Sequence, residues 1–169
     1  MIKLIDILKE SISEKELKSV RDWVVDDYNT GFGYNSNTDI VSLIKLLKSY
    51  TYKGKIYRLV SIPKDITDIK DYIWKKGKDR YSSFTDNLSG IKYFLPFIED
   101  EDEQAVIISQ VSYYYSLSEW YDNNIDDLEV LYNTDSEKYW WINQSLPEVE
   151  NTGEAIAKLD PDFEIYKVL

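Results

Sequence analysis

Hydrophobic residues recur at helical spacing along the first fifty residues of the chain. Over residues 2–28 the apolar side chains are mostly three or four positions apart, which predicts one or two amphipathic helices. The segment NTGFGYNSN, residues 29–37, is rich in Asn, Gly and Ser and interrupts this pattern. Thr38 or Asp39 can then cap a second helix that runs to about Leu47. Two helical elements are therefore expected before any strand.

From Lys55 onward the pattern changes to alternation of apolar and polar residues, with many β-branched side chains. The run KIYRLVSI predicts a strand over 55–62 that ends at Pro63. A short helix or loop over 64–80, a short strand over 81–86 and a helix over 88–97, cut near Pro96, are expected next. Four later runs are β-branched and aromatic and predict strands: QAVIISQVSYYYSL, DLEVLYN, EKYWWINQSL and FEIYKVL.

These elements predict an α+β chain, with a helical lead-in over residues 1–50 packed on a mainly antiparallel, sheet-rich core over 51–169. The 169 residues contain no internal repeat and no Pro-rich or Gly/Ser-rich linker, so a single domain over 1–169 is expected. Hydrophobic residues make up 43% of the chain, which is enough to form a core. No run is long and apolar enough for a membrane span or a signal peptide, so a cytoplasmic location and no membrane partner are expected.

Charge and missing residue types exclude several classes of function. The 31 acidic and 20 basic side chains give a formal charge of −11, which disfavours nucleic acid as a partner unless basic residues cluster locally. The chain has no Cys and no His, which removes disulfides, thiolate nucleophiles, the usual zinc sites and Ser-His-Asp arrangements. The segment DNNIDDLEVLYN lacks the Gly and the final Glu of a calcium loop, and the acidic run at 99–103 is expected to be a solvated turn. No metal is expected.

Three polar features interrupt apolar runs: Arg58 in KIYRLV, Ser83 with Thr85 in YSSFT, and Glu129 in DLEVLY. Each alone fits an ordinary half-exposed strand. In this order they resemble the mono-ADP-ribosyltransferase family, in the branch defined by Arg, Ser-x-Ser/Thr and Glu-x-Glu motifs. The helical lead-in VRDWVVDDYNTGFGYNSNTDIVSLIKLL is also similar, so the resemblance covers roughly residues 20–135. It implies an ADP-ribosyltransferase-like fold with a split β-sheet.

The resemblance implies that the chain binds NAD as a substrate, cleaves its nicotinamide–ribose bond and transfers ADP-ribose to a macromolecular acceptor such as a protein. Bond cleavage builds positive charge on the ribose carbon, and a fixed carboxylate stabilises that charge. By resemblance this carboxylate is Glu129, Ser83 orients it, and Arg58 binds the pyrophosphate with its planar fork of donors. Asp127 stands where the family usually has Glu or Gln and bears on the choice of acceptor.

The resemblance assigns further contacts around the nicotinamide and the acceptor. Leu59 would supply the backbone contact to the nicotinamide amide, at a position where the family commonly has Gly, and Thr85 takes the third position of the serine motif. Tyr93 and Phe94 lie where the family places an aromatic ring against nicotinamide. Trp120 and Tyr121 are candidates for acceptor recognition, or equally an aromatic pair that packs at the edge of the sheet.

Two other functions fit the sequence. A glycohydrolase would cleave NAD with water as the acceptor, so no label from NAD would remain on protein. An acidic interaction protein, for instance a nucleic-acid mimic that blocks a DNA-binding partner, would need no catalysis. A small transferase without a secretion signal would suit a phage-encoded or bacterial effector that acts in the cytoplasm where it is made or injected.

Overall fold

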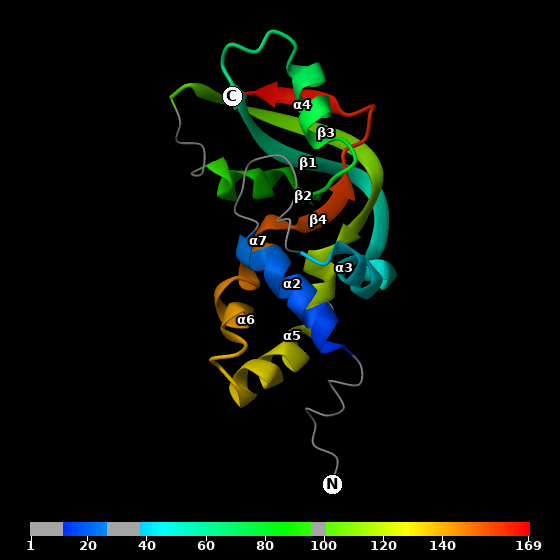
Figure 1. The fold of residues 1–169 in the computed structure, drawn as a ribbon, viewed down its shortest axis with the longest axis vertical. Coiled ribbons are helices and arrows are strands. Elements are labelled where there is room, and N and C mark those ends of the chain that lie inside the picture. The colour runs from blue at the N-terminus through cyan, green and yellow to red at the C-terminus, as the bar shows by residue number, and fades with distance from the viewer. Residues whose placement is uncertain (1–11, 27–37, 96–100) are drawn as a thin grey trace.

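The computed structural model describes residues 12–26, 38–95 and 101–169. Its helices are α2 (Glu14–Asp26), α3 (Ile40–Leu47), α4 (Ile69–Gly77), α5 (Leu117–Thr134), α6 (Trp140–Gln144) and α7 (Pro147–Thr152), with short 3₁₀ helices η1 (Lys48–Tyr50) and η2 (Leu88–Tyr93). Its strands are β1 (Thr51–Pro63), β2 (Tyr81–Thr85), β3 (Glu103–Ser116), β4 (Glu154–Lys158) and β5 (Glu164–Val168). The strands and α4 occupy one half of the molecule, and most of the helices gather in the other half (Figure 1).

The strands form a small closed barrel with one extra strand. Their order is β1-β2-β4-β3, and β3 pairs back with β1, while β5 is added to the outer side of β3. All of these pairs are antiparallel. The β1–β3 ladder runs the whole length of β1, whereas β1 and β2 share one residue pair and β3 and β4 share two. The barrel therefore consists of two ladders, β1–β3–β5 and β2–β4, that meet at narrow corners.

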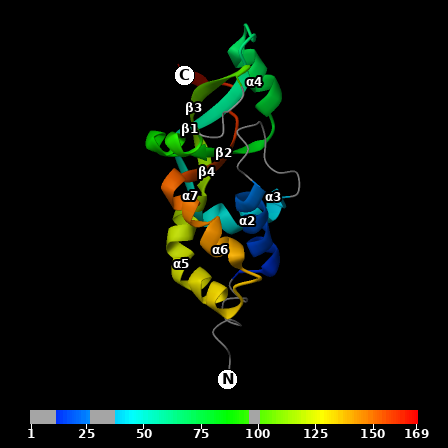
Figure 2. The same cartoon turned by 90° about the vertical axis from the view of Figure 1, so that its left-hand side faces the viewer.

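The space between the two ladders is filled by apolar side chains, which we call the barrel core. Alternate residues of β1 and β3 point into it, as the two-residue period of a strand requires. The short strands β2 and β4 close it from the other side, and α4 covers it at the end away from the other helices (Figure 2). Its main members are Ile56, Val60, Ile62, Ile73, Phe84, Val106, Ile108, Ala155, Ala157 and Phe163.

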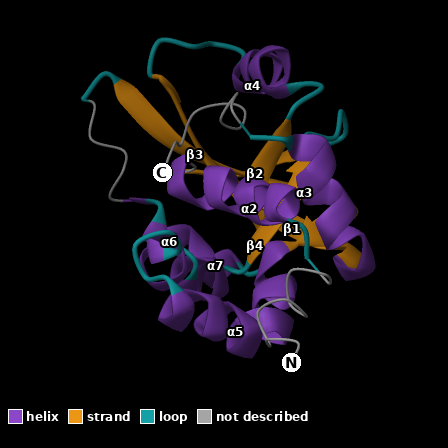
Figure 3. Ribbon diagram, turned by 60° about the horizontal axis from the view of Figure 1, so that its bottom comes forward, coloured by secondary structure: helices purple, strands orange, loops and turns teal. Residues whose placement is uncertain are grey.

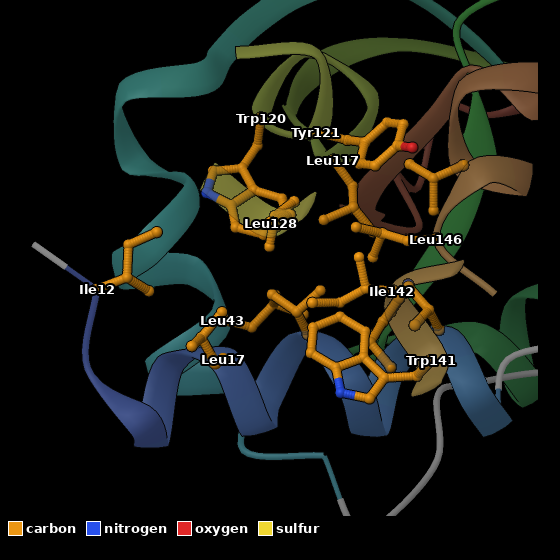
Figure 4. Close-up of a cluster of buried hydrophobic side chains, with 14 of the residues drawn as sticks. Ile12, Leu17, Leu43, Leu117, Trp120, Tyr121, Leu128, Trp141, Ile142 and Leu146 are labelled. Atoms are coloured by element: carbon orange, nitrogen blue, oxygen red, sulfur yellow. The ribbon is translucent and has the colours of Figure 1, made fainter. Parts of the chain in front are cut away.

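A second cluster, the helical core, lies between the outer face of β4 and the helices. In the view from the helical end, α2 lies in front of β2 and β4, with α5, α6 and α7 grouped beside it (Figure 3). Three buried tryptophans, Trp23, Trp120 and Trp141, belong to this core. Figure 4 shows Trp120 and Leu128 of α5 opposite Leu17 of α2 and Leu43 of α3, with Trp141 and Ile142 of α6 beside them.

The prediction of a mixed chain with helices first and an antiparallel sheet after is confirmed in outline. The helix capped by Asp39, the strand ending at Pro63 and the strands over 81–86, 104–117 and 163–169 are found close to their expected places. The first part of the predicted N-terminal helix lies outside the described residues. Instead of a split sheet, the structure has two ladders that close into a barrel.

Two of the predicted strands are wrong. The segments DLEVLYN and EKYWWINQSL belong to α5 and to the α6 region, respectively. The sheet instead gains a strand that the sequence analysis did not predict, β4, with the sequence EAIAK. Within the described ranges, no helix combines the length and the apolar character needed to cross a membrane.

Candidate functional site

Ser83 and Glu154 meet on one face of the short β2–β4 ladder. Antiparallel pairing places Ser83 opposite Ile156 and Thr85 opposite Glu154, so Ser83 and Glu154 are diagonal neighbours on the same face. The Ser83 hydroxyl donates a hydrogen bond to Oε1 of Glu154. Both side chains are nearly enclosed, with 7% and 6% of their surface exposed. The sheet thus carries a buried carboxylate with a hydroxyl donor from the neighbouring strand.

Trp23 supplies a second donor to the same carboxylate oxygen. Its indole Nε1–H donates to Glu154 Oε1 over 3.1 Å, and the ring is 1% exposed. Trp23 lies on α2, whose amphipathic face packs against the sheet through the helical core. A buried carboxylate is costly unless donors compensate for the lost water. Ser83 and Trp23 provide such donors and fix the position of Oε1.

Arg58, on strand β1, joins the same group of residues. Its position on β1 is flanked by Ile56 and Val60 on the inner face of the barrel, and its side chain is nearly buried. The guanidinium Nη1 donates to the backbone carbonyl of Ser83. Because β1 and β2 share only the pair Tyr57 and Thr85, this bond replaces ladder bonds that the corner lacks. Arg58 therefore anchors the residue that carries the hydroxyl on Glu154.

The backbone immediately before Glu154 is held by the turn between α7 and β4, which we call the junction. Gly153 ends α7 with a φ of 62°, and its carbonyl accepts the Asp86 N–H at 3.1 Å. The Thr85 hydroxyl contacts the carbonyl of Thr152 and accepts the Asn87 N–H at 3.0 Å. These contacts tie the start of β4 to the end of β2. The carboxylate is therefore positioned by the backbone as well as by the donors Ser83 and Trp23.

Asp86, at this junction, and Tyr114, on β3, carry perturbed ionisable groups. Partial burial and the nearby Glu119 carboxylate raise the pKa of Asp86 above its usual value. Partial burial, and then the charge of Asp86, raise the pKa of the Tyr114 hydroxyl. In both groups burial is the larger cause of the raised pKa, and neighbouring negative charge is the smaller one.

A small cavity of about 40 Å³ adjoins the carboxylate. It is lined by Trp23, Val24, Phe94, Ser145, Glu148, Val149, Thr152 and Glu154. This volume accommodates roughly one water molecule. The lining contains two carboxylates and no cation, so the cavity favours a neutral or positively charged group beside Glu154.

Several of the predicted site residues lie at this place. Arg58 and Ser83 are directly connected, Thr85 supports the start of β4, and Phe94 lines the cavity. Tyr93, next to Phe94, is 44% exposed and is not among the residues that line it. Leu59 points to the other face of β1, where it packs with Ile91 and Ile107.

The predicted catalytic residues Glu129 and Asp127 are not at this place. Both side chains are exposed on α5, which begins where β3 ends. At a rise of about 1.5 Å per residue, Glu129 lies about 18 Å along the helix axis from Leu117, the first residue of α5. Trp120 and Tyr121, predicted to recognise the acceptor, are buried in the helical core. Both rings are nearly enclosed there, so they lie in the helical core and not at the edge of the sheet.

The helix at 117–134 has a clear local cause. Ser116 Oγ accepts the Glu119 N–H at 3.2 Å, and Ser-x-x-Glu is the pattern of a capping box. Apolar residues then follow at helical spacing: Leu117, Trp120, Tyr121, Leu128 and Leu131. The strand-like run around Glu129 forms about two turns of this helix, with Leu128 and Leu131 buried and Asp127 and Glu129 exposed.

Sequence reasoning missed Glu154 and the role of Trp23. The segment EAIAKL lies between Gly153 and the Asp160-Pro161 turn, and its short apolar run bounded by turn residues was the available signal. Trp23 fits the apolar face of its helix and gave no sign of a polar partner. Glu154 is hydrogen-bonded to Ser83, which lies 71 positions earlier in the chain, and to Trp23, which lies 131 positions earlier.

No protein family, curated protein or solved structure matches this chain. Within the described residues no group of three or more acidic side chains is placed to hold a metal ion.

Proposed function

We propose that the chain is an NAD-dependent mono-ADP-ribosyltransferase in which Glu154, rather than Glu129, is the catalytic carboxylate. One observation carries the proposal: the Ser83 hydroxyl is bonded to Glu154 while Arg58 holds the carbonyl of the same serine. The three residue types of the motif that the sequence resembles thus come from the adjacent strands β1, β2 and β4.

The roles follow from the chemistry of glycosyl transfer. Loss of nicotinamide leaves positive charge on the ribose carbon, and a preorganised carboxylate in a site with little water stabilises that charge. Glu154 would supply the charge, and Ser83 and Trp23 would hold it in place. By resemblance, Arg58 would bind the pyrophosphate. In addition, its bond to Ser83 holds β2 in place.

Binding of NAD requires the cavity to widen, because it now holds roughly one water molecule. Phe94 lines the cavity and is only partly buried, whereas Trp23 and Val149 are fully buried in the helical core. Rotation of Phe94 is therefore the smallest change that would admit a nicotinamide ring. The displaced ring would then stack against the ligand, as the resemblance implies for this position.

The residue two positions before Glu154 is Thr152, where the family usually has Glu or Gln. The Thr152 hydroxyl donates to the carbonyl of Glu148 at 3.0 Å, so it is engaged within α7. Without a carboxylate at this position to activate an acceptor, water is the simplest competitor. This observation favours NAD glycohydrolase as the second candidate function.

The test compares wild-type protein with Glu154→Gln, and Glu129→Gln is the matched control on the exposed face of α5. Glutamine keeps an oxygen that can accept from Ser83 and Trp23, so the fold is retained while the charge is removed. We expect Glu154→Gln to release nicotinamide about 10²–10³ times more slowly, the usual effect of losing one preorganised electrostatic group. Glu129→Gln should keep wild-type activity. Circular dichroism of each variant checks folding.

Labelled NAD and a bacterial lysate separate the candidate functions. Label on protein supports the transferase, and free nicotinamide without labelled protein supports the glycohydrolase. If the wild type neither binds NAD by calorimetry nor releases nicotinamide, both enzymatic proposals fail and the acidic interaction protein remains. Full activity in Glu154→Gln would remove Glu154 from the mechanism.

A further inference from the structure

A second and much larger cavity lies between α2 and the segment that joins α5 to α6. Its volume is about 360 Å³, within the range of small-molecule sites. One wall is a face of α2 and the other comes from the start of α6 and the residues before it. The lining residues are Glu14, Lys15, Leu17, Lys18, Arg21, Lys138, Tyr139 and Trp141. We call this hollow the basic pocket.

The charge of the basic pocket is opposite to that of the molecule. Its lining has four cations and one carboxylate, in a chain of net charge −11. The cavity beside Glu154 has two carboxylates and no cation, and the hollow beside α4 has three aspartates and two lysines. A local concentration of cations against the net charge of the chain selects an anionic ligand.

The cations of the pocket are available to a ligand. Lys15 and Lys18 pair with Asp39 at 3.5 Å and Asp22 at 2.6 Å, and neither acid lines the pocket. Lys138 reaches across to Glu14 at 3.3 Å. Exposed pairs of this kind contribute little to stability, so an anion of higher charge can replace them at little cost.

Arg21 is the strongest single indication of the ligand. It forms no ion pair within the ranges that the structure describes, although it stands three residues after Lys18 on the same side of α2. A guanidinium presents a planar fork of donors that matches the oxygens of a phosphate. The exposed head of the ligand is therefore expected to be a phosphate.

The floor of the pocket differs from its rim. Leu17, Tyr139 and Trp141 are nearly buried members of the helical core and present apolar surface to the hollow. A ligand that fits both parts has a flat apolar body and a charged head. We propose that the basic pocket binds a small organic phosphate on a planar ring, the chemistry of a nucleotide. This proposal concerns residues outside the Ser83–Glu154 site and does not depend on its function.

The test titrates the full chain with AMP and with adenosine, which has the same ring and no phosphate. Indole N–H signals in NMR spectra locate the ligand, because Trp141 lines the basic pocket and Trp23 lines the other cavity. Arg21→Gln removes the guanidinium from the pocket. Lys76→Gln, in the last turn of α4, removes an equal charge from a hollow rich in aspartate and serves as the matched control.

We expect AMP to bind at least about 10-fold more tightly than adenosine and to shift the Trp141 signal while that of Trp23 stays in place. Arg21→Gln should weaken AMP binding about 10-fold, which corresponds to one charge-assisted hydrogen bond, and Lys76→Gln should have no effect. Absence of AMP binding, or equal binding of adenosine, would overturn the proposal. Equal effects of the two variants would show diffuse attraction, and a shift confined to Trp23 would place AMP in the other cavity. Either result also rejects the proposal.

Discussion

Two hydrogen-bond donors of different kinds bind the same carboxylate oxygen of Glu154. The Ser83 hydroxyl comes from the neighbouring strand and can rotate about its C–O bond, whereas the Trp23 indole is fixed by packing in the helical core. A rigid donor sets the position of the carboxylate, and a rotating one can follow it as charge develops nearby. This combination suits a carboxylate that must hold one place while its electrostatic environment changes.

Replacement of Ser83 by Ala tests this arrangement without requiring activity. The substitution leaves a buried acceptor with one donor fewer, which costs about 1–3 kcal/mol of unfolding free energy. Ser82→Ala is the control, since Ser82 is equally buried but its position in β2 points to the opposite face. Urea denaturation of both variants measures the difference. Equal losses in the two variants would mean that the Ser83–Glu154 bond contributes nothing specific.

Part of this site could be predicted from single residues. Arg58 and Ser83 interrupt apolar strand patterns, so the sequence indicates that they need a polar partner. The partner could not be identified in the same way, because Glu154 is 71 positions from Ser83 and 131 from Trp23. Contacts at such separation depend on how strands and helices are ordered in space. Motif order along the chain pointed to Glu129 in its place.

At the scale of elements, the errors of prediction have two physical causes. In α5, β-branched and aromatic residues resemble a strand over seven positions, but the capping box at Ser116 and the spacing over eighteen positions favour a helix. In β4, two of the five residues are alanines, which have low strand propensity. Its pairing with β2 and β3 decides its conformation, and a single sequence carries no direct record of that pairing.

Gly153 is the position where one residue decides an element boundary. Its φ of 62° is unfavourable for residues with a side chain, and an added Cβ would overlap the Asp86 carboxylate. We expect Gly153→Ala to lower the unfolding free energy by about 1–3 kcal/mol and to move the start of β4. If Glu154 acts as proposed, activity falls with it.

Gly54→Ala is the matched control for this change. A Cβ on Gly54, in β1, would meet only Tyr114 Cε1 at 3.9 Å, an ordinary contact. This variant should therefore be neutral or more stable by about 0.5–1 kcal/mol, since Gly in a strand is less favourable than Ala. Thermal unfolding of the two variants measures the contrast. Similar stabilities would show that the turn before Glu154 tolerates a side chain.

At the scale of the whole molecule, β4 joins the two cores. Ile156 belongs to the helical core, while Ala155 and Ala157 on either side of it belong to the barrel core. Neither core can therefore lose its packing without disturbing the strand that the other requires. Trp23 adds a second connection, since its ring lies in the helical core and its N–H holds the first residue of β4.

This shared strand predicts that the chain unfolds in one cooperative transition, as expected for a single domain. In a Trp74→Phe background, the four remaining tryptophans belong to the helical core or pack against it, so their fluorescence reports on that core alone. Ile62→Ala removes a fully buried side chain of the barrel core and should cost about 2–5 kcal/mol. We expect the fluorescence midpoint to fall together with that of far-UV circular dichroism. A fluorescence midpoint that stays in place while the dichroism transition moves would mean that the barrel and the helical half unfold separately.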